Sequence, residues 1–163
     1  MDDILIRRAT ESDLPTLGRL GALLMQTHYA FDQQRFMAPG ANAAAGYARF
    51  LRSQLTQQDV IVFVAERAGH VAGYVYAGLE PRSWEELREA AGFIHDVAVE
   101  ESSRRTGIAS ALVEAAIEWF RAREAPRVIL WTAEPNAAAL RLFSRLGFRR
   151  TMIEMTRELL QGE

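Results

Sequence analysis

The residues with the clearest chemical potential form a short charged loop at the start of a helix. Residues 99–110 read V-E-E-S-S-R-R-T-G-I-A-S, and the pattern Arg104-x-x-Gly107-x-Ala109 leads from a strand end into an apolar-periodic helix. The first four N–H groups of a helix have no intrahelical partner, and the helix dipole adds about half a positive charge there. Gly107 permits a positive φ or a close backbone approach, and Ala109 is too small to block a ligand. The pattern predicts a phosphate-binding loop, for which an ordinary strand-to-helix turn is the alternative.

A second strand–helix unit follows this loop. Residues 128–132 form a short β-rich apolar run that Pro135 ends, and Asn136 precedes a helix expected over residues 137–146 and closed by Gly147. A strand expected over residues 93–99 would pair in parallel with residues 128–132 through a crossover helix. Both carboxyl ends then lie at one edge of the sheet, which is where ligands bind in such sheets.

Together the two units resemble the GNAT superfamily of N-acetyltransferases. The first pattern, placed after a strand that ends in Val99, resembles the acyl-CoA signature of that family. The second unit is similar to the strand–Asn–helix–Gly-Phe ending of the family, through Asn136-x-x-Ala139-x-x-x-Phe143-x-x-x-Gly147-Phe148. The resemblance implies one N-acetyltransferase (GNAT) domain over residues 1–163, with acetyl-CoA as the cosubstrate.

The resemblance also implies which residues contact acetyl-CoA. It places the pantetheine arm in the gap between two splayed strands, where its amides bond to main chain near Val97 and Val99 and meet Asn136. Arg104 is expected to fold back and brace the loop, whereas Arg105 is expected to reach a phosphate. The amides of residues 105–110 are expected to hold the pyrophosphate. The complete expected set is Val97, Val99, Arg104, Arg105, Thr106, Gly107, Ile108, Ala109, Ser110, Asn136 and Phe143.

Transfer of an acetyl group to an amine requires a neutral amine, because a lysine-like amine with a pKa near 10.4 is mostly protonated at neutral pH. A general base is therefore worth seeking. Strand alternation places His95 and Asp96 on opposite faces, so only one of them is expected to face the acyl site. Glu134, a substrate-loop carboxylate or a water chain are further alternatives. A core histidine and a structural hydrogen-bond anchor are the non-catalytic interpretations of His95 and Asp96.

Two positions depart from the family pattern. Relatives often carry Glu six residues before the final Val of the strand, where this chain has Phe93. They often carry Tyr at the position of Phe143, where its hydroxyl can protonate the departing thiolate. By resemblance, the oxyanion donor is expected to be the backbone N–H of Val97 or Val99. The missing Glu and Tyr keep open a non-catalytic acyl-CoA-binding or sensing module, with an interaction protein that does not use CoA as a third class.

The acceptor is expected to contact the segments 26–58 and 80–92, which flank the acyl site in this layout. The first contains H-Y-A-F-D at residues 28–32, and the second contains Trp84, Glu85, Glu86 and Glu89. Carboxylates among aromatic rings suit a cationic amine, although a solvated helix face and core packing also account for them. We expect acetyl transfer to a primary amine, of a small molecule rather than a protein, by direct attack in a ternary complex.

Composition excludes several other classes. The chain of 163 residues suits one domain, and with no cysteine it has no disulfide, thiolate–metal site or cysteine nucleophile. We expect no metal site. A net charge of −2 without a basic tract argues against nucleic acid as a partner. No apolar run approaches the ~18 residues of a membrane span, and the acidic start lacks the basic region of a signal peptide. We expect a cytoplasmic monomer or homodimer.

Hydrophobic periodicity predicts an α/β (α+β) domain with a mixed, mostly antiparallel central sheet, a parallel splayed strand pair and helices on both faces. The capping pair Thr10 and Asp13 precedes the first helix. In the helix after the phosphate loop, an apolar stripe is expected to pack on the sheet. Strands are expected at 4–9, 60–66, 71–79, 93–99, 128–132 and 148–159, and helices at 14–25, 42–55, about the centre of 80–92, 108–121 and 137–146.

Overall fold

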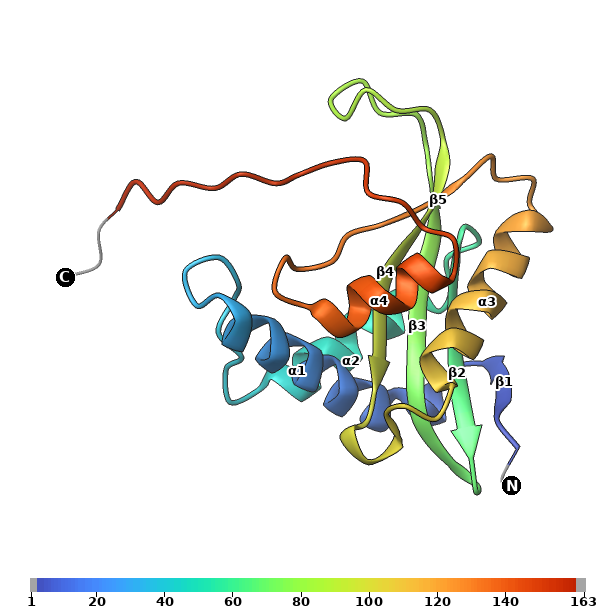
Figure 1. Cartoon of the computed structure of the whole chain (residues 1–163). Coiled ribbons are helices and arrows are strands. Elements are labelled where there is room, and N and C mark those ends of the chain that lie inside the picture. Colours follow the sequence, from blue (N-terminus) through green and yellow to red (C-terminus); the bar gives the residue numbers. More distant parts are fainter. Residues whose placement is uncertain (1–2, 161–163) are drawn as a thin grey trace.

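The computed structural model describes residues 3–160, so Met1 and Asp2 of the acidic start lie outside the described residues. Short 3-10 turns at Glu11–Asp13 and Glu101–Ser103 precede the first and third helices. The elements in chain order (Figure 1) are β1 (Leu5–Arg8), α1 (Leu14–Phe31), α2 (Ala43–Gln54), β2 (Val60–Arg67), β3 (His70–Glu80), β4 (Ala91–Val99), α3 (Ile108–Arg121), β5 (Val128–Leu130) and α4 (Ala137–Arg145).

The strands form one five-stranded sheet in the sequential order β1-β2-β3-β4-β5. The first four strands pair antiparallel, whereas β4 and β5 pair in parallel across the crossover helix α3. The parallel ladder is short, because it joins only residues 92–94 to residues 128–130. The predicted mixed sheet with a parallel strand pair is confirmed.

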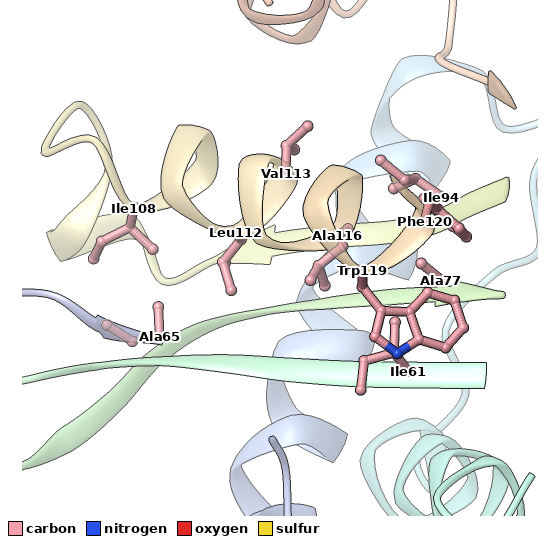
Figure 2. Packing of buried hydrophobic residues seen from close by; sticks show 12 residues of the cluster. Ile61, Ala65, Ala77, Ile94, Ile108, Leu112, Val113, Ala116, Trp119 and Phe120 are labelled. Atoms are coloured by element: carbon pink, nitrogen blue, oxygen red, sulfur yellow. The ribbon is translucent and has the colours of Figure 1, made fainter. Parts of the chain in front are cut away.

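Helices cover both faces of this sheet and enclose two apolar cores. On one face, α3 buries Leu112 and Trp119 against the strands, and Figure 2 shows both side chains directed at the sheet. Phe143 of α4 and Phe148 pack against the same core from outside. On the other face, α1 and α2 bury a separate cluster with Leu17 and Leu51 at its centre, together with Tyr74 of β3. These two cores fix the strands that carry the expected site.

The predicted capping pair is present, but α1 is longer than the sequence suggested. Asp13 accepts a hydrogen bond from the Thr10 N–H at 2.8 Å. Beyond Met25, where the helix was expected to end, the Thr27 hydroxyl and the His28 ring bond back to carbonyl groups one turn earlier, at 2.8 Å each. These bonds keep polar residues in helical conformation, so the loss of apolar periodicity does not end the helix. The helix ends at Phe31.

Two other expected elements are absent from the described residues. No helix forms within residues 80–92, because Ser83 and Arg88 exchange backbone hydrogen bonds at 3.0 and 3.1 Å and close a loop in which Leu87 has a φ of +52°. The predicted closing strand over residues 148–159 is also wrong. Residues 149–160 are exposed and pair with no strand of this chain, because the apolar side chains among them are not packed on either core.

One extra residue in β4 changes which side chains face the site. Successive residues of β3 pair with Asp96 and Ile94, so His95 between them has no partner. Such a bulge interrupts the alternation of side chains. Asp96 bonds to Tyr47 of α2, and the His95 ring lies 4.8 Å from that of Tyr76, which packs on the same helical layer. The expected placement of His95 and Asp96 on opposite faces is therefore wrong, because both lie on the same face of the sheet.

Candidate functional site

The predicted phosphate loop forms a cup of unpaired backbone donors. Arg105 and Gly107 have φ values of +62° and +88°, which turn the chain sharply before Ile108 begins α3. The first backbone bond of the helix runs from Ala111 N–H to the Gly107 carbonyl at 3.0 Å. Within the described residues, the N–H groups of residues 105–110 donate to no protein acceptor. Such a run of free donors at a helix N-terminus is suited to an anion.

The base of this loop is held by side chains. Arg104 folds back, and its Nε donates to the Val99 carbonyl at 3.3 Å, as expected for a bracing residue. The Thr106 hydroxyl donates to the Ser103 carbonyl at 2.5 Å. Glu100 accepts from the Ser103 hydroxyl at 2.6 Å, and this bond, with the nearby His70, lowers the pKa of the Glu100 carboxyl. These side-chain hydrogen bonds hold the loop in this conformation without a ligand.

The strands beside the loop separate where the parallel ladder ends. Beyond Ile94 and Leu130, β4 continues through Val97 and Val99 with β3 on one side and, among the described residues, no strand on the other. This leaves an open edge of backbone groups that leads from the loop into the sheet. An extended chain with amide groups can pair with such an edge as an added strand.

The remaining expected contacts lie on α4. Asn136 is its N-cap, and the Asn136 side-chain oxygen accepts from the Ala139 N–H at 3.1 Å. The Asn136 amide oxygen is therefore used for capping, which leaves the amide nitrogen for a ligand. Phe143 packs on the α3 core with its ring 5.7 Å from that of Phe148. The geometry shows Phe143 as a packing residue.

Asp96 is a partly buried anchor between the sheet and α2. It accepts hydrogen bonds from the hydroxyls of Tyr47 on α2 and of Tyr74 on β3, the latter at 3.0 Å. Burial raises the pKa of the Asp96 carboxyl, and the two tyrosine bonds oppose that shift. Burial beside this carboxylate also raises the pKa of Tyr47 and of Tyr74, so both remain donors. With both hydroxyls directed at it, Asp96 serves to join α2 to β4.

His95 occupies a different environment, at the wall of a pocket. Its ring lies between those of Tyr76, at 4.8 Å, and Phe93, which stacks on it at 5.6 Å. Its Nε2 is 3.4 Å from a carboxylate oxygen of Glu80, the last residue of β3. The imidazole is partly exposed, with 31% of its side chain accessible. Two aromatic rings and a carboxylate thus fix an imidazole that solvent or substrate can reach.

The pocket beside His95 has a volume of about 220 Å³ and lies where β4 and β5 diverge. Arg88 in its wall pairs with Glu86 at 2.5 Å and lies 5.2 Å above the Phe93 ring. Two carboxylates line the pocket, and Arg88 offsets the charge of one of them, Glu86. The other, Glu80, pairs with no arginine among the described residues. The lining residues are Glu80, Glu86, Arg88, Phe93, Ile94, His95 and Trp131.

Sequence reasoning missed Trp131 as a pocket residue, whereas Glu80, Glu86 and Arg88 lie in the segment 80–92 that was expected to contact the acceptor. One sequence signal could have indicated two of these residues: Glu80 directly follows the predicted strand 71–79, and Trp131 lies near the end of the predicted strand 128–132. The pocket residues nevertheless come from segments that only the fold brings together. Conversely, Trp84 and Glu89, expected on the acceptor side, lie outside this pocket. Glu89 pairs with Arg82 at 2.7 Å, and Arg82 also covers the Trp84 ring. No helix in residues 3–160 has the length and apolar character of a membrane span.

A mixed sheet with a splayed parallel pair, a donor-lined loop at the first turn of α3 and a pocket at the splay define an acyl-CoA-binding acetyltransferase fold. The Acetyltransferase (GNAT) family matches residues 22–148, and the chain belongs to that family. Acetyl-CoA is the acyl donor of this family, in agreement with the expected cosubstrate.

Curated relatives resemble part of the chain. A mycothiol acetyltransferase of Thermobispora bispora is 33% identical over 93 residues, which is 57% of this chain and 31% of that protein. An uncharacterized N-acetyltransferase of Methanocaldococcus jannaschii is 37% identical over 86 residues, or 53% of this chain and 38% of that protein. The chain thus matches about a third of the length of these relatives.

Solved structures show the same fold over nearly the whole chain. The aminoglycoside N-acetyltransferase AAC(6')-Iy in complex with CoA superposes with a TM-score of 0.78 at 17% identity, covering 98% of this chain and 97% of that one. A protein of Bacillus halodurans described as a transcriptional regulator superposes with a TM-score of 0.75 at 22% identity, covering 96% of this chain and 100% of that one. At these identities the likeness establishes the fold.

Proposed function

We propose that this protein is an acetyl-CoA-dependent N-acetyltransferase that transfers the acetyl group to a primary amine of a small molecule. The observation that carries the proposal is the position of His95: an imidazole held by two aromatic rings and Glu80, in the wall of a pocket at the point where β4 and β5 separate. A general base in this pocket can take a proton from an acceptor amine that enters opposite the open edge of β4, where the proposed acetyl-CoA site lies.

The cosubstrate supplies an acetyl thioester, and the chain supplies its binding surface. The free N–H groups of residues 105–110 would hold the pyrophosphate, with Arg105 beside them. The open main chain of β4 at Val97 and Val99 would pair with the amides of the pantetheine arm. One of these two N–H groups is also the proposed donor to the oxyanion. Asn136 and Phe143 would line the sulfur end.

His95 is the proposed general base, with Glu80 as its positioning residue. A protonated amine cannot attack, and an imidazole is a side chain that accepts protons near neutral pH. Glu80 at 3.4 Å orients the ring and stabilises the imidazolium that forms. Asp96, whose Oδ2 accepts from both the Tyr47 and the Tyr74 hydroxyl, is proposed to act by holding β4 in position. No cysteine or serine lines the pocket, which favours direct attack in a ternary complex over a covalent acetyl-enzyme.

The pocket favours a small cationic acceptor. Glu80 offers a negative charge, while Phe93 and Trp131 offer aromatic faces, and together these attract an ammonium group. A volume of about 220 Å³ admits a group of side-chain size. Carboxylates and aromatic rings in so small a space suit the amine end of a polyfunctional molecule better than an extended peptide.

A matched pair of glycine variants tests the cosubstrate site. Gly107 and Gly147 both have a φ of +88° and open space around the position of a Cβ, so Gly107→Glu and Gly147→Glu impose the same backbone strain. Only Gly107→Glu places a carboxylate among the phosphate donors. Calorimetry should therefore show at least tenfold weaker acetyl-CoA binding for Gly107→Glu alone. Equal affinity in both variants would refute the loop as the phosphate site.

Release of free thiol from acetyl-CoA over a broad panel of amines tests the reaction itself. We expect turnover with small diamines or amino sugars and none with peptides. The second candidate, a non-catalytic acyl-CoA-binding module, is favoured by Phe143, which lacks the hydroxyl of a thiolate donor. It predicts tight binding of acetyl-CoA with no amine turned over.

A further inference from the structure

One oxygen of the Asp96 carboxylate accepts no hydrogen bond from the described residues. Both tyrosine hydroxyls that bond to Asp96 donate to the same atom, Oδ2, and Oδ1 has no such donor. In residues 3–160, the only buried side-chain polar atoms without a partner are Trp119 Nε1 and the Thr132 hydroxyl oxygen. Oδ1 of Asp96 is therefore not fully buried, and a ligand can reach it.

Asp96 also lacks a cationic partner. Within the part of the chain that the structure describes, no arginine forms an ion pair with it, and the sequence contains no lysine. Carboxylates taken out of water are normally paired, because an unpaired buried charge is costly. Burial raises the pKa of Asp96; the imidazoles of His95 and His28 oppose this rise without bonding to the carboxylate. A cation in contact with Oδ1 would stabilise the charged form further.

Tyr76 of β3 connects Asp96 to the pocket. Tyr76 is the register partner of Asp96, and Glu80, which lines the pocket, is the last residue of the same strand. Burial raises the pKa of the Tyr76 hydroxyl, and the charges of Asp96 and of Glu80 each raise it further, so both carboxylates act on this side chain. The strand from Tyr76 to Glu80 spans ~13 Å, a length that an extended alkyl diamine can bridge.

Aromatic rings line the path between the two carboxylates. The Tyr76 ring lies 4.8 Å from that of His95 and 5.6 Å from that of Phe50 on α2. The Tyr76 hydroxyl donates to the side-chain oxygen of Gln54 at 3.1 Å, which fixes the ring. Phe50 is 44% exposed, so this row of rings has a face that a ligand can contact. Such faces attract ammonium groups.

We propose that Asp96 is a specificity-determining residue that selects acceptors with two cationic groups. The reacting amine binds in the pocket beside Glu80 and His95, and the second ammonium donates to Oδ1 of Asp96, with the linker across the Tyr76 ring. This assignment, which rests on the proposed N-acetyltransferase function, gives the acceptor as a linear diamine or polyamine. Asp96 binds the group that does not react and takes no proton from the reacting amine.

Linear diamines compared with monoamines of equal length test this assignment. The series has three to eight methylene groups between the amines. In the parent, kcat/KM for the best diamine should exceed that for its matching monoamine at least tenfold, as expected for a hydrogen bond to a charged group. Asp96→Asn keeps the size of the side chain and an oxygen for the tyrosines but removes the charge. The diamine preference should then disappear, through KM rather than kcat.

Tyr47→Phe is the matched control. It removes one hydrogen bond to Oδ2 and leaves the charge of Asp96 in place, so it should lower thermal stability and retain the diamine preference. A purely structural role for Asp96 predicts the same behaviour in both variants. Parental preference in Asp96→Asn, or equal use of diamines and monoamines by the parent, would overturn the proposal.

Calorimetry of the same amines in the presence of CoA separates this proposal from the reaction. The best diamine should bind the parent at least tenfold more tightly than its monoamine, and Asp96→Asn should bind the two equally. A binding preference without turnover of any amine would refute the acetyltransferase proposal and support the dication site. Turnover without a preference would refute the dication site alone.

Discussion

At the scale of single residues, one inserted position in β4 decides how the site is built. The bulge at His95 brings His95 and Asp96 to the same face of the sheet, yet their surroundings differ. Asp96 is partly buried and its Oδ2 accepts from two tyrosine hydroxyls, whereas His95 lines the pocket. Two adjacent polar residues thus have different surroundings, one that holds β4 and one that lines the pocket in which we propose the acceptor binds.

Replacing His95 tests its role as the base. His95→Gln should lower kcat/KM at pH 7 by about 10²–10⁴-fold, the usual contribution of a general base. The loss should shrink toward pH 9–10, because solvent then supplies the neutral amine directly. Glu80→Gln should lower kcat by a smaller factor with the same pH trend. The measurement is a pH–rate profile of acetyl transfer, and a loss for His95→Gln that is equal at all pH values contradicts the assignment.

Variants of Phe143 distinguish the proposed enzyme from the alternative, a non-catalytic acyl-CoA-binding module. A thiol pKa of about 8.5 makes thiolate a fair leaving group without a proton donor. Phe143→Tyr should therefore leave kcat equal or moderately higher. Phe143→Ala should mainly weaken folding and acetyl-CoA binding, with a stability loss below the ~3–5 kcal/mol of a fully buried Phe, because this side chain is partly exposed. Turnover that appears only in Phe143→Tyr would support the binding module instead.

At the scale of elements, the contact between α1 and α2 positions Asp96. A Cβ built on Gly21 of α1 would lie 2.1 Å from the ring of Tyr47, so the glycine permits this ring to sit against α1. The Tyr47 hydroxyl in turn donates to Asp96 of β4. The packing of two helices is thereby linked to the strand that carries His95.

Two glycine-to-alanine variants in these helices should have opposite effects. Gly21→Ala displaces the Tyr47 ring and should destabilise the fold by about 1–3 kcal/mol, as overpacking does. Gly46 of α2 has nothing within 4 Å of its Cβ position, so Gly46→Ala should stabilise the fold by about 0.5–1 kcal/mol through helix propensity. Urea unfolding with matched m-values measures both. Gly21→Ala with parental stability would show that the contact is loose.

At the scale of the whole molecule, different parts of the sheet form the two proposed ligand sites. In the proposed function, the antiparallel strands with α1 and α2 form the acceptor side, and the β4–α3–β5 unit forms the acetyl-CoA side. The two sides meet at the separation of β4 from β5, where the pocket lies. A ligand held there contacts both halves of the fold and should stabilise it as a unit.

Acetyl-CoA should accordingly raise the melting temperature. A ligand at 100 times its Kd stabilises the native state by about 2.7 kcal/mol. For a domain of 163 residues this corresponds to a rise of about 5–10 °C in Tm. Differential scanning calorimetry should show this rise in the parent and in Gly147→Glu. A similar rise in Gly107→Glu would contradict binding at the loop.

The sequence by itself determined the local features: the loop with Gly107, the Asn136 cap, the capping pair before α1 and most of the strands. These depend on neighbours within a few residues, because caps, positive φ values and apolar alternation are local properties. The order of the two motifs was also sufficient for the family.

Only the tertiary structure decided which side chains meet. The bulge at His95 depends on pairing with β3, and alternation along one strand cannot reveal an extra residue in its partner's register. Glu80, His95 and Trp131 converge from three segments because the sheet brings the ends of β3 and β5 beside the bulge in β4. The apolar residues within 148–159 predict a strand, but a strand forms only through pairing with a sheet edge, and residues 149–160 pair with none in this structure.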